Sequence, residues 1–236
     1  MATCNGARYV ERQVASILEQ LAEDDELVVS DDGSSDETIA LVRKFDDPRI
    51  RILEDSVFRS PLGNFEHAVR HARGDTLVLS DQDDVWLSNK LPLVRELFAG
   101  ETARPFLVVL DAEVVDEDGR AVYPSVLEKL GAAPGLFRNL WTNRYLGCCM
   151  AFSRDLLDAA LPFPPGVGMH DIWLGQLCER IGTTRFVHVV TMQYRRHDAN
   201  VTGFDIRFEP VRQVRRRLSL AWSLARVTAR TRRRSS

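Results

Sequence analysis

The sequence has few cysteines and no long apolar run, and both absences limit what the protein can be. Its 236 residues include only four cysteines, Cys4, Cys148, Cys149 and Cys178, and none forms a Cys-x-x-Cys pair. Adjacent cysteines are poor partners for each other, so the pattern is typical of a reducing compartment rather than a disulfide scaffold. No apolar run reaches membrane-spanning length and no signal-peptide pattern is present, so we expect a cytoplasmic protein.

The charged side chains are unevenly distributed along the chain. The formal net charge is −3, yet residues 207–236 hold ten Arg and a single Glu. That segment therefore carries +9 and leaves −12 on residues 1–206. We expect a globular α/β domain over residues 1–206 and a basic tail over residues 207–236. The acidic domain would repel phosphate, which argues against nucleic acid as a partner.

The most informative stretch is residues 76–87, TLVLSDQDDVWL. Five apolar or small residues predict a buried parallel strand, and Asp81, Asp83 and Asp84 follow it directly. Carboxylates this close repel one another, and a cation normally offsets the repulsion; hard oxygen ligands suit Mg²⁺ or Mn²⁺. Ligands of open α/β sheets bind outside the carboxyl ends of the strands. We therefore interpret the stretch as a ligand site rather than an acidic turn before a solvated helix.

Strands and helices alternate through residue 110, which predicts a mainly parallel sheet with helices on both faces. The later half is more mixed, with a loop-rich insertion over residues 124–144 and further strands over residues 145–152 and 184–190. A strand would normally precede the first helix, whose apolar residues lie between 10 and 21, but only residues 1–4 could supply it. We therefore expect that most of one strand is missing, because the natural protein starts upstream or the chain is truncated.

Three acidic clusters fall at strand ends or helix starts: Asp31 with Asp32, residues 81–84, and Asp171. Their order and spacing resemble family 2 glycosyltransferases, which have a nucleotide-sugar-binding α/β fold called GT-A. The resemblance covers residues 3–203. The segments that carry it are Thr3 to Gly6, Val29 to Asp36, Gly63 to Phe65, Gly74 with Asp75, Ser80 to Trp86, Gly147 to Phe152, His170 with Asp171, and Tyr194 to Asn200. The forms Asp-Gln-Asp-Asp-Val-Trp, His-Asp and Tyr-Arg-x-His are most similar to the bacterial rhamnosyltransferase-like branch.

The resemblance implies a metal-dependent, inverting transfer of a sugar, with rhamnose as one candidate, from a nucleoside diphosphate sugar to a glycan or lipid-linked hydroxyl. Mg²⁺ or Mn²⁺ would stabilise the departing diphosphate, and one base suffices for a single displacement. The implied roles are general base for Asp171, metal binding for Asp83 and His197, and donor binding for Asp31, Asp32, Asn64, Asp81, Arg195 and Arg196. Many relatives have Glu-Asp where this chain has His170 and Asp171, which leaves open what orients the base.

Each of these roles has an alternative. Asp171 could cap the helix that begins at Ile172, and His197 and the two arginines could be ordinary surface residues. A phosphatase of the haloacid dehalogenase type would use Asp81 as nucleophile and Asp83 as acid, but it requires a later Gly-Asp-x-x-x-Asp motif that the sequence lacks. A non-catalytic relative that binds nucleotide sugars or glycans stays open, and the sequence identifies neither donor, acceptor nor oligomeric state.

The basic tail has apolar residues at helical spacing, including Leu218 and Trp222, among its arginines. Such a helix suits the surface of a membrane that carries anionic lipid, and we expect it to place the protein at the inner face of the cytoplasmic membrane. The alternative is a helix packed on the protein's own acidic domain.

Overall fold

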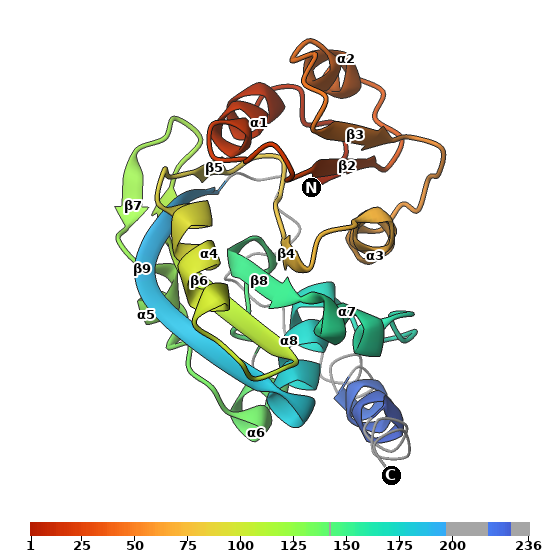
Figure 1. Cartoon of the computed structure of the whole chain (residues 1–236), viewed down its shortest axis with the longest axis vertical. Helices are drawn as coiled ribbons and strands as arrows, with labels where there is room; N and C mark the ends of the chain where they lie inside the picture. Colours follow the sequence, from red (N-terminus) through yellow and green to blue (C-terminus); the bar gives the residue numbers. More distant parts are fainter. Residues whose placement is uncertain (142, 197–216, 228–236) are drawn as a thin grey trace.

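The computed structural model describes residues 1–141, 143–196 and 217–227, and it divides the strands between two sheets (Figure 1). The smaller sheet is parallel, in the order β1-β2-β3, with β1 at Ala2–Thr3, β2 at Leu27–Asp31 and β3 at Ile50–Leu53. All five residues of β2 are buried, as expected of a parallel strand covered on both faces. The α/β class predicted from the sequence is confirmed.

Three helices accompany this sheet: α1 (Val10–Leu18), α2 (Thr38–Arg43) and α3 (Pro61–His71). Helix α1 buries Val10, Val14 and Ile17 completely or almost so, because these residues recur on one face at helical spacing. Helix α3 begins where Ser60 accepts a hydrogen bond from the Gly63 amide, with a proline at its first position.

The larger sheet is mixed and has the order β4-β8-β6-β9-β5, with β7 paired to β6. Its strands are β4 (Thr76–Val78), β5 (Val85–Trp86), β6 (Phe106–Val115), β7 (Ala121–Tyr123), β8 (Met150–Ser153) and β9 (Thr183–Arg195). Strands β6 and β9 are parallel, whereas β8 runs antiparallel to both of its neighbours, β4 and β6. The strand predicted over residues 145–152 is shorter in the structure. It begins only at Met150, because Gly147–Cys149 form a 3₁₀ turn before it.

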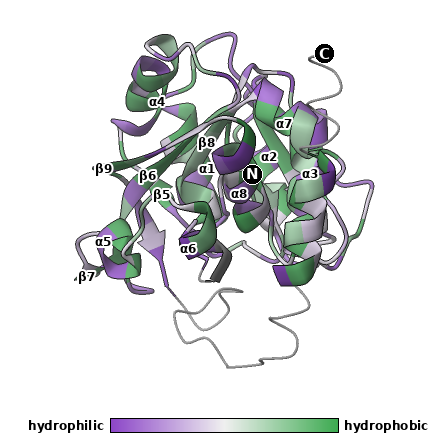
Figure 2. Ribbon diagram, turned by 90° about the horizontal axis from the view of Figure 1, so that it is seen from below, coloured by the Kyte–Doolittle hydropathy of each residue, from purple (hydrophilic) through white to green (hydrophobic). Residues whose placement is uncertain are grey.

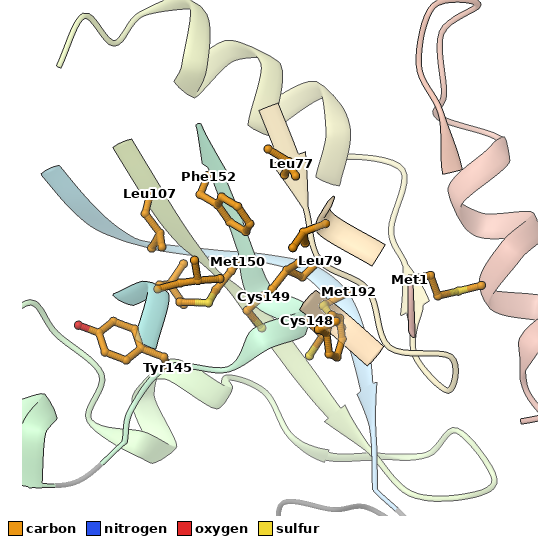
Figure 3. Close-up of a cluster of buried hydrophobic side chains, with 14 of the residues drawn as sticks. Met1, Leu77, Leu79, Leu107, Tyr145, Cys148, Cys149, Met150, Phe152 and Met192 are labelled. Atoms are coloured by element: carbon orange, nitrogen blue, oxygen red, sulfur yellow. The ribbon is translucent and has the colours of Figure 1, made fainter. Parts of the chain in front are cut away.

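Successive residues of β6 face different helices. Phe106 and Val108 pack with Val94 and Phe98 of α4 (Lys90–Ala99). The alternate residue Leu107 belongs to the main core with α7 (Arg154–Ala160) and α8 (His170–Ile181). Figure 2 shows β6 and β8 as largely hydrophobic, and Figure 3 shows Leu107, Met150 and Phe152 in one buried cluster.

Two short helices, α5 (Val126–Leu130) and α6 (Leu136–Trp141), lie in the stretch predicted as a loop-rich insertion. Farther along the chain, residues 217–227 form a helix that lies against the globular body. Its Leu220 and Leu224 are buried, and the Ser219 hydroxyl donates to the Pro165 carbonyl at 3.0 Å. The predicted boundary between residues 206 and 207 falls outside the described residues and stays a prediction. No helix in the described ranges is long and apolar enough to cross a bilayer.

Candidate active site

Two of the acidic clusters lie at or just past the C-terminal ends of β2 and β4. The Ala2 amide donates to the Ser80 carbonyl at 3.2 Å, and the Thr3 hydroxyl donates to Asp31 at 2.8 Å. Strand β1 therefore touches both acid-bearing strand ends. Asp171, at the start of α8, is close enough for its charge to raise the pKa of Asp81.

The loop that carries Asp81 to Asp84 is fixed by neutral amide side chains. Gln82 exchanges two hydrogen bonds with the backbone of Cys4, at 2.8 and 3.0 Å. Gln13, fully buried in α1, donates to the Ser80 hydroxyl at 2.7 Å and to the Asp81 carbonyl at 3.1 Å. A Cβ atom at Gly6 would lie 2.2 Å from the Gln82 carboxamide oxygen, so this close approach requires glycine.

Burial is the largest influence on the pKa values of Asp81 and Asp84 in this loop. It raises the pKa of Asp81 to about 7, and the nearby Asp83 adds to the shift. Asp84 is 1% exposed; its Oδ1 accepts from the Arg195 amide at 3.1 Å, whereas Oδ2 has no hydrogen-bond partner in the described part of the chain. Burial also holds the pKa of Asp84 well above its usual range.

A buried lysine lies beneath these acids. Lys90 donates from Nζ to the Cys148 carbonyl at 2.8 Å, and Nζ lies 4.7 Å from the centre of the Trp86 ring. Burial lowers its pKa, while Asp84 and Asp81 act in the opposite direction. The sequence analysis missed Lys90; a lysine followed by Leu91 and Leu93 in the first turn of a helix was the available signal.

The donor atoms at this strand end fit a divalent cation. Ligand atoms of Asp81, Asp84 and Cys148 lie within 4.8 Å of one another, and the orphaned Oδ2 of Asp84 is one of the oxygens that a cation would satisfy. Carboxylates suit Mg²⁺ or Mn²⁺, whereas burial raises the pKa of the Cys148 thiol and makes it a poor thiolate ligand. Of the predicted metal ligands, Asp83 is half-buried in the same loop and His197 lies outside the described residues.

The predicted donor-binding acids Asp31 and Asp32 are both held by hydrogen bonds. Asp32 accepts from three successive amides, those of residues 58–60, at 2.5, 2.8 and 2.9 Å. Asp31 accepts from the amide of Ser34 at 2.7 Å. Asn64 donates to the Thr3 carbonyl at 3.0 Å, and its buried Oδ1 has no partner within the described residues. These residues shape the wall between β2 and α3, and their contact with a donor stays a prediction.

Arg195 is 4% exposed, so it is not a solvated surface residue. Its guanidinium donates to the carbonyls of Asp83, Asp116 and Glu117 at 3.0 to 3.1 Å. It thereby ties the acidic loop to the turn between β6 and β7. Arg196 is half-buried, and its amide continues the sheet by donating to the Val115 carbonyl at 2.9 Å. The predicted diphosphate contacts of both arginines remain untested.

Asp171, the predicted base, is 4% exposed, and burial raises its pKa to about 6. Two hydrogen bonds oppose the rise: Asn143 Nδ2 donates to one carboxylate oxygen at 3.0 Å and the Ile172 amide to the other at 2.6 Å. Asn143 is itself fixed, since its Oδ1 accepts from the Tyr145 amide at 3.1 Å. Asn143 therefore orients Asp171, a role that the sequence pattern left open.

His170 does not contact Asp171 through a hydrogen bond. Its ring stacks on Phe65 with centroids 4.0 Å apart, and neither ring nitrogen has a partner in the part of the chain that the structure describes. Burial lowers its pKa to about 3, so the imidazole is neutral. A Cβ at Gly147 would lie 2.4 Å from Nε2, so the turn before β8 needs glycine to pass the ring.

Solved structures that resemble this chain define its class by fold. Staphylococcus aureus TarS in complex with UDP-GlcNAc matches with a TM-score of 0.66 at 17% identity, over 84% of this chain and 58% of TarS. The Pyrobaculum calidifontis mannosyltransferase PcManGT in complex with GDP-Man and Mn²⁺ matches with a TM-score of 0.60 at 19% identity, over 97% and 71%. The predicted GT-A fold is thus confirmed. Residues 1–161 match the model of glycosyl transferase family 2, and the chain belongs to that family.

Two bacterial relatives are similar to this chain in sequence. The Escherichia coli UDP-Glc:α-D-GlcNAc-diphosphoundecaprenol β-1,3-glucosyltransferase WfgD is 33% identical over 39% of this chain. The Shigella flexneri dTDP-rhamnosyl transferase RfbG is 26% identical over 89% of this chain and 75% of its own length. The chain spans 37% of the length of the E. coli enzyme.

Proposed function

We propose that this protein transfers a sugar from a nucleoside diphosphate sugar to a hydroxyl of a glycan or lipid-linked acceptor, with inversion. The observation that carries the proposal is the meeting of Asp171, buried and with a pKa of about 6, with the acidic loop at the end of β4. A carboxylate poised near neutral pH suits proton abstraction from a hydroxyl. The family membership and the names of the relatives point to the same chemistry.

In this mechanism Asp171 receives the proton of the acceptor hydroxyl, whose oxygen attacks the anomeric carbon on the face opposite the diphosphate. Asn143 and the Ile172 amide hold the carboxylate in one orientation during the transfer. Asp83, with Asp81 and Asp84 beside it, would hold Mg²⁺ or Mn²⁺, and the bound ion would stabilise negative charge on the departing diphosphate. A single displacement needs no nucleophile from the protein, so neither Cys148 nor Cys149 is required.

Rhamnose is a candidate sugar because a relative that matches 89% of this chain is named a dTDP-rhamnosyl transferase. A lipid-linked acceptor is supported by two relatives named for diphosphoundecaprenol or PP-undecaprenol substrates, from E. coli and Campylobacter jejuni. We therefore infer that the acceptor is a saccharide on a polyprenyl diphosphate.

The test is release of nucleoside diphosphate from a panel of dTDP-rhamnose, UDP-glucose, UDP-GlcNAc and GDP-mannose, with Mn²⁺ and a saccharide-diphosphoundecaprenol acceptor. We expect acceptor-dependent release with at least one donor. Phosphate release from sugar phosphates in place of transfer would instead support the phosphatase alternative. Tight donor binding without turnover by any acceptor would support the non-catalytic alternative.

We further propose that the helix over residues 217–227 binds an anionic membrane surface facing the cytoplasm. One face of it carries Leu220 and Leu224 and packs on the body, whereas Leu218 and Trp222, one turn apart, are 66% and 61% exposed. The Arg226 guanidinium lies 4.3 Å from the centre of the Trp222 ring, so the exposed apolar pair is flanked by positive charge. Aromatic and aliphatic side chains beside arginine suit the lipid interface.

Vesicle co-sedimentation tests this membrane proposal. Leu218→Ser with Trp222→Ser should reduce binding to anionic vesicles at least tenfold, and so should a chain that ends at Phe208. Phe137→Ser is the matched control, because Phe137 is 80% exposed on α6. Equal binding to neutral vesicles, or binding unchanged in the double variant, would contradict the proposal.

A further inference from the structure

Three residues of α8 at a spacing of four lie on one face of that helix: Asp171, Gly175 and Glu179. The segment over residues 135–145, which includes Asn143, contacts all three of them. Asp171 is the proposed base and stands at the start of the helix, whereas Glu179 lies about two turns farther along. The contacts of this face therefore join the base to a second acid that the mechanism does not use.

Glu179 accepts hydrogen bonds from the whole length of this segment. Its Oε1 accepts from the Tyr145 hydroxyl, and from Asn139 Nδ2 and the Gly135 amide at 3.0 Å each. Its Oε2 accepts from the same Gly135 amide at 3.1 Å. Hydrogen bonds to a carboxylate are stronger than those between neutral groups. Glu179 thus fixes the segment before, within and after α6.

Tyr145 connects Glu179 to the site. Its ring is buried, and a Cβ at Gly175 would lie 2.5 Å from a ring carbon, so the ring packs directly on the helix backbone. Figure 3 shows its hydroxyl directed away from the other labelled side chains. At the other end of the residue, the Tyr145 amide donates to Asn143 Oδ1 at 3.1 Å, and Asn143 Nδ2 donates to Asp171 at 3.0 Å. A chain of contacts therefore leads from Glu179 to the base.

Asn143 depends on this chain because it is exposed, so packing does not hold its side chain in one orientation. We propose that Glu179 is a positioning residue: through Tyr145 it holds Asn143 in the place from which Asn143 orients Asp171. The effect on turnover rests on the proposed function, whereas the anchoring of the segment does not. Glu179 lies about 12 Å from Asp171 along the helix axis, so it acts through contacts rather than as a partner of the acceptor.

The groups around Asp171 set the direction of the expected effect. Hydrogen bonds from Asn143 and from the Ile172 amide lower its pKa against the effect of burial. The neighbouring His170 is neutral, because burial lowers its pKa to about 3, and the charge of Asp171 is felt by Asp81. Misplacement of Asn143 should therefore raise the pKa of Asp171 and move the acidic limb of kcat to higher pH. The expected shift is about half a unit, the scale of one neutral hydrogen bond.

Two substitutions of Glu179 separate its hydrogen bonds from its charge. Glu179→Gln and Glu179→Met remove the same charge, but only glutamine keeps an oxygen for Tyr145, Asn139 and Gly135. With the donor that shows turnover in the panel above, kcat should fall roughly tenfold in Glu179→Met and no more than about threefold in Glu179→Gln, at an unchanged donor KM. The acidic limb should move in Glu179→Met alone. Arg180→Met, at the next and exposed position of α8, is the control and should change neither quantity.

Tyr145→Phe is the milder variant and covers the case in which Glu179→Met does not fold. It keeps the ring on the helix and removes only the hydroxyl, so its acidic limb should move in the same direction. Hydrogen exchange adds a readout that needs no turnover. The Tyr145 amide should exchange about tenfold faster in Glu179→Met and in Tyr145→Phe, and at the wild-type rate in Glu179→Gln.

The outcomes distinguish positioning from a purely structural role. Equal kinetics of Glu179→Gln and Glu179→Met would overturn the proposal, because the hydrogen bonds would then have no separate effect. Lower stability of Glu179→Met with an unmoved acidic limb would overturn it too, since Glu179 would then only hold the fold. Faster exchange of the Tyr145 amide in a protein that transfers no sugar would support the anchoring and contradict the proposed function instead.

Discussion

Replacement of Asp171 by asparagine should remove activity and also change how stability depends on pH. Asp171 is 4% exposed, and burial raises its pKa from 3.8 to about 6. A carboxyl whose pKa is raised by folding destabilises the folded state only while it is ionised there. The penalty is therefore complete above pH 6, falls as the pH drops through 6, and vanishes below 3.8. Asparagine is neutral throughout and carries no such penalty.

The size of the effect follows from the two pKa values. The difference between them corresponds to about 3 kcal/mol at pH 8 and about 1.6 kcal/mol at pH 5. Relative to Asp171→Asn, the wild type should therefore lose about 1.4 kcal/mol of unfolding free energy between pH 5 and pH 8, or roughly 3 to 6 °C in Tm. A weaker hydrogen bond from Asn143 or Ile172 would change the unfolding free energy of the variant by the same amount at every pH. It would therefore leave the difference between pH 5 and pH 8 unchanged.

Urea unfolding of both proteins at pH 5, 6, 7 and 8 measures the difference, and Asp158→Asn, an exposed acid on α7, is the control. Transfer should fall by about 10²- to 10⁴-fold in Asp171→Asn while donor binding is kept. Stability curves that stay parallel across this pH range would refute the raised pKa. Turnover that persists while donor affinity collapses would make Asp171 a binding residue instead.

Two further substitutions test the neighbouring groups. Asp83→Ala should abolish transfer and weaken Mn²⁺-dependent donor binding by calorimetry, whereas Asp158→Ala should do neither; undiminished activity of Asp83→Ala would remove Asp83 from the metal site. Asn143→Ala should keep donor binding but move the acidic limb of kcat to higher pH, because the lost hydrogen bond favours ionised Asp171. A limb that does not move in Asn143→Ala would show that Asn143 has no influence on the base.

The apolar runs in the sequence predicted the strands well, but not how they divide into two sheets. Residues 106–110 are all apolar, and they form the first half of β6. Strand β4 pairs with β8, more than seventy residues away, and that antiparallel partnership depends on tertiary contacts that no local pattern encodes. Likewise, Gly147–Cys149 form a turn where the strand was expected to start, and the His170 ring lies where a Cβ on Gly147 would stand.

The positions of the first two acidic clusters were predictable because each follows an apolar run, and ligands of α/β sheets bind beyond the carboxyl ends of the strands. The residues that fix those acids by hydrogen bonds were not predictable in the same way. Gln13 lies on the apolar face of α1 between Val10 and Val14, and a polar residue in that pattern could have marked it as a buried hydrogen-bonding group. Asn143 lies in a stretch without periodicity, where no sequence signal distinguishes it from any other loop residue.

Arg195 places a basic side chain next to the acidic loop. A guanidinium stays charged in proteins and offers five donors, so it can fix several carbonyls while its charge remains in place. Arg195 uses these donors on the backbone of Asp83 and of the turn after β6, and Lys90 lies below the same loop with its ammonium buried. The acidic loop thus has two basic side chains on its buried side, Arg195 and Lys90, which are 4% and 0% exposed.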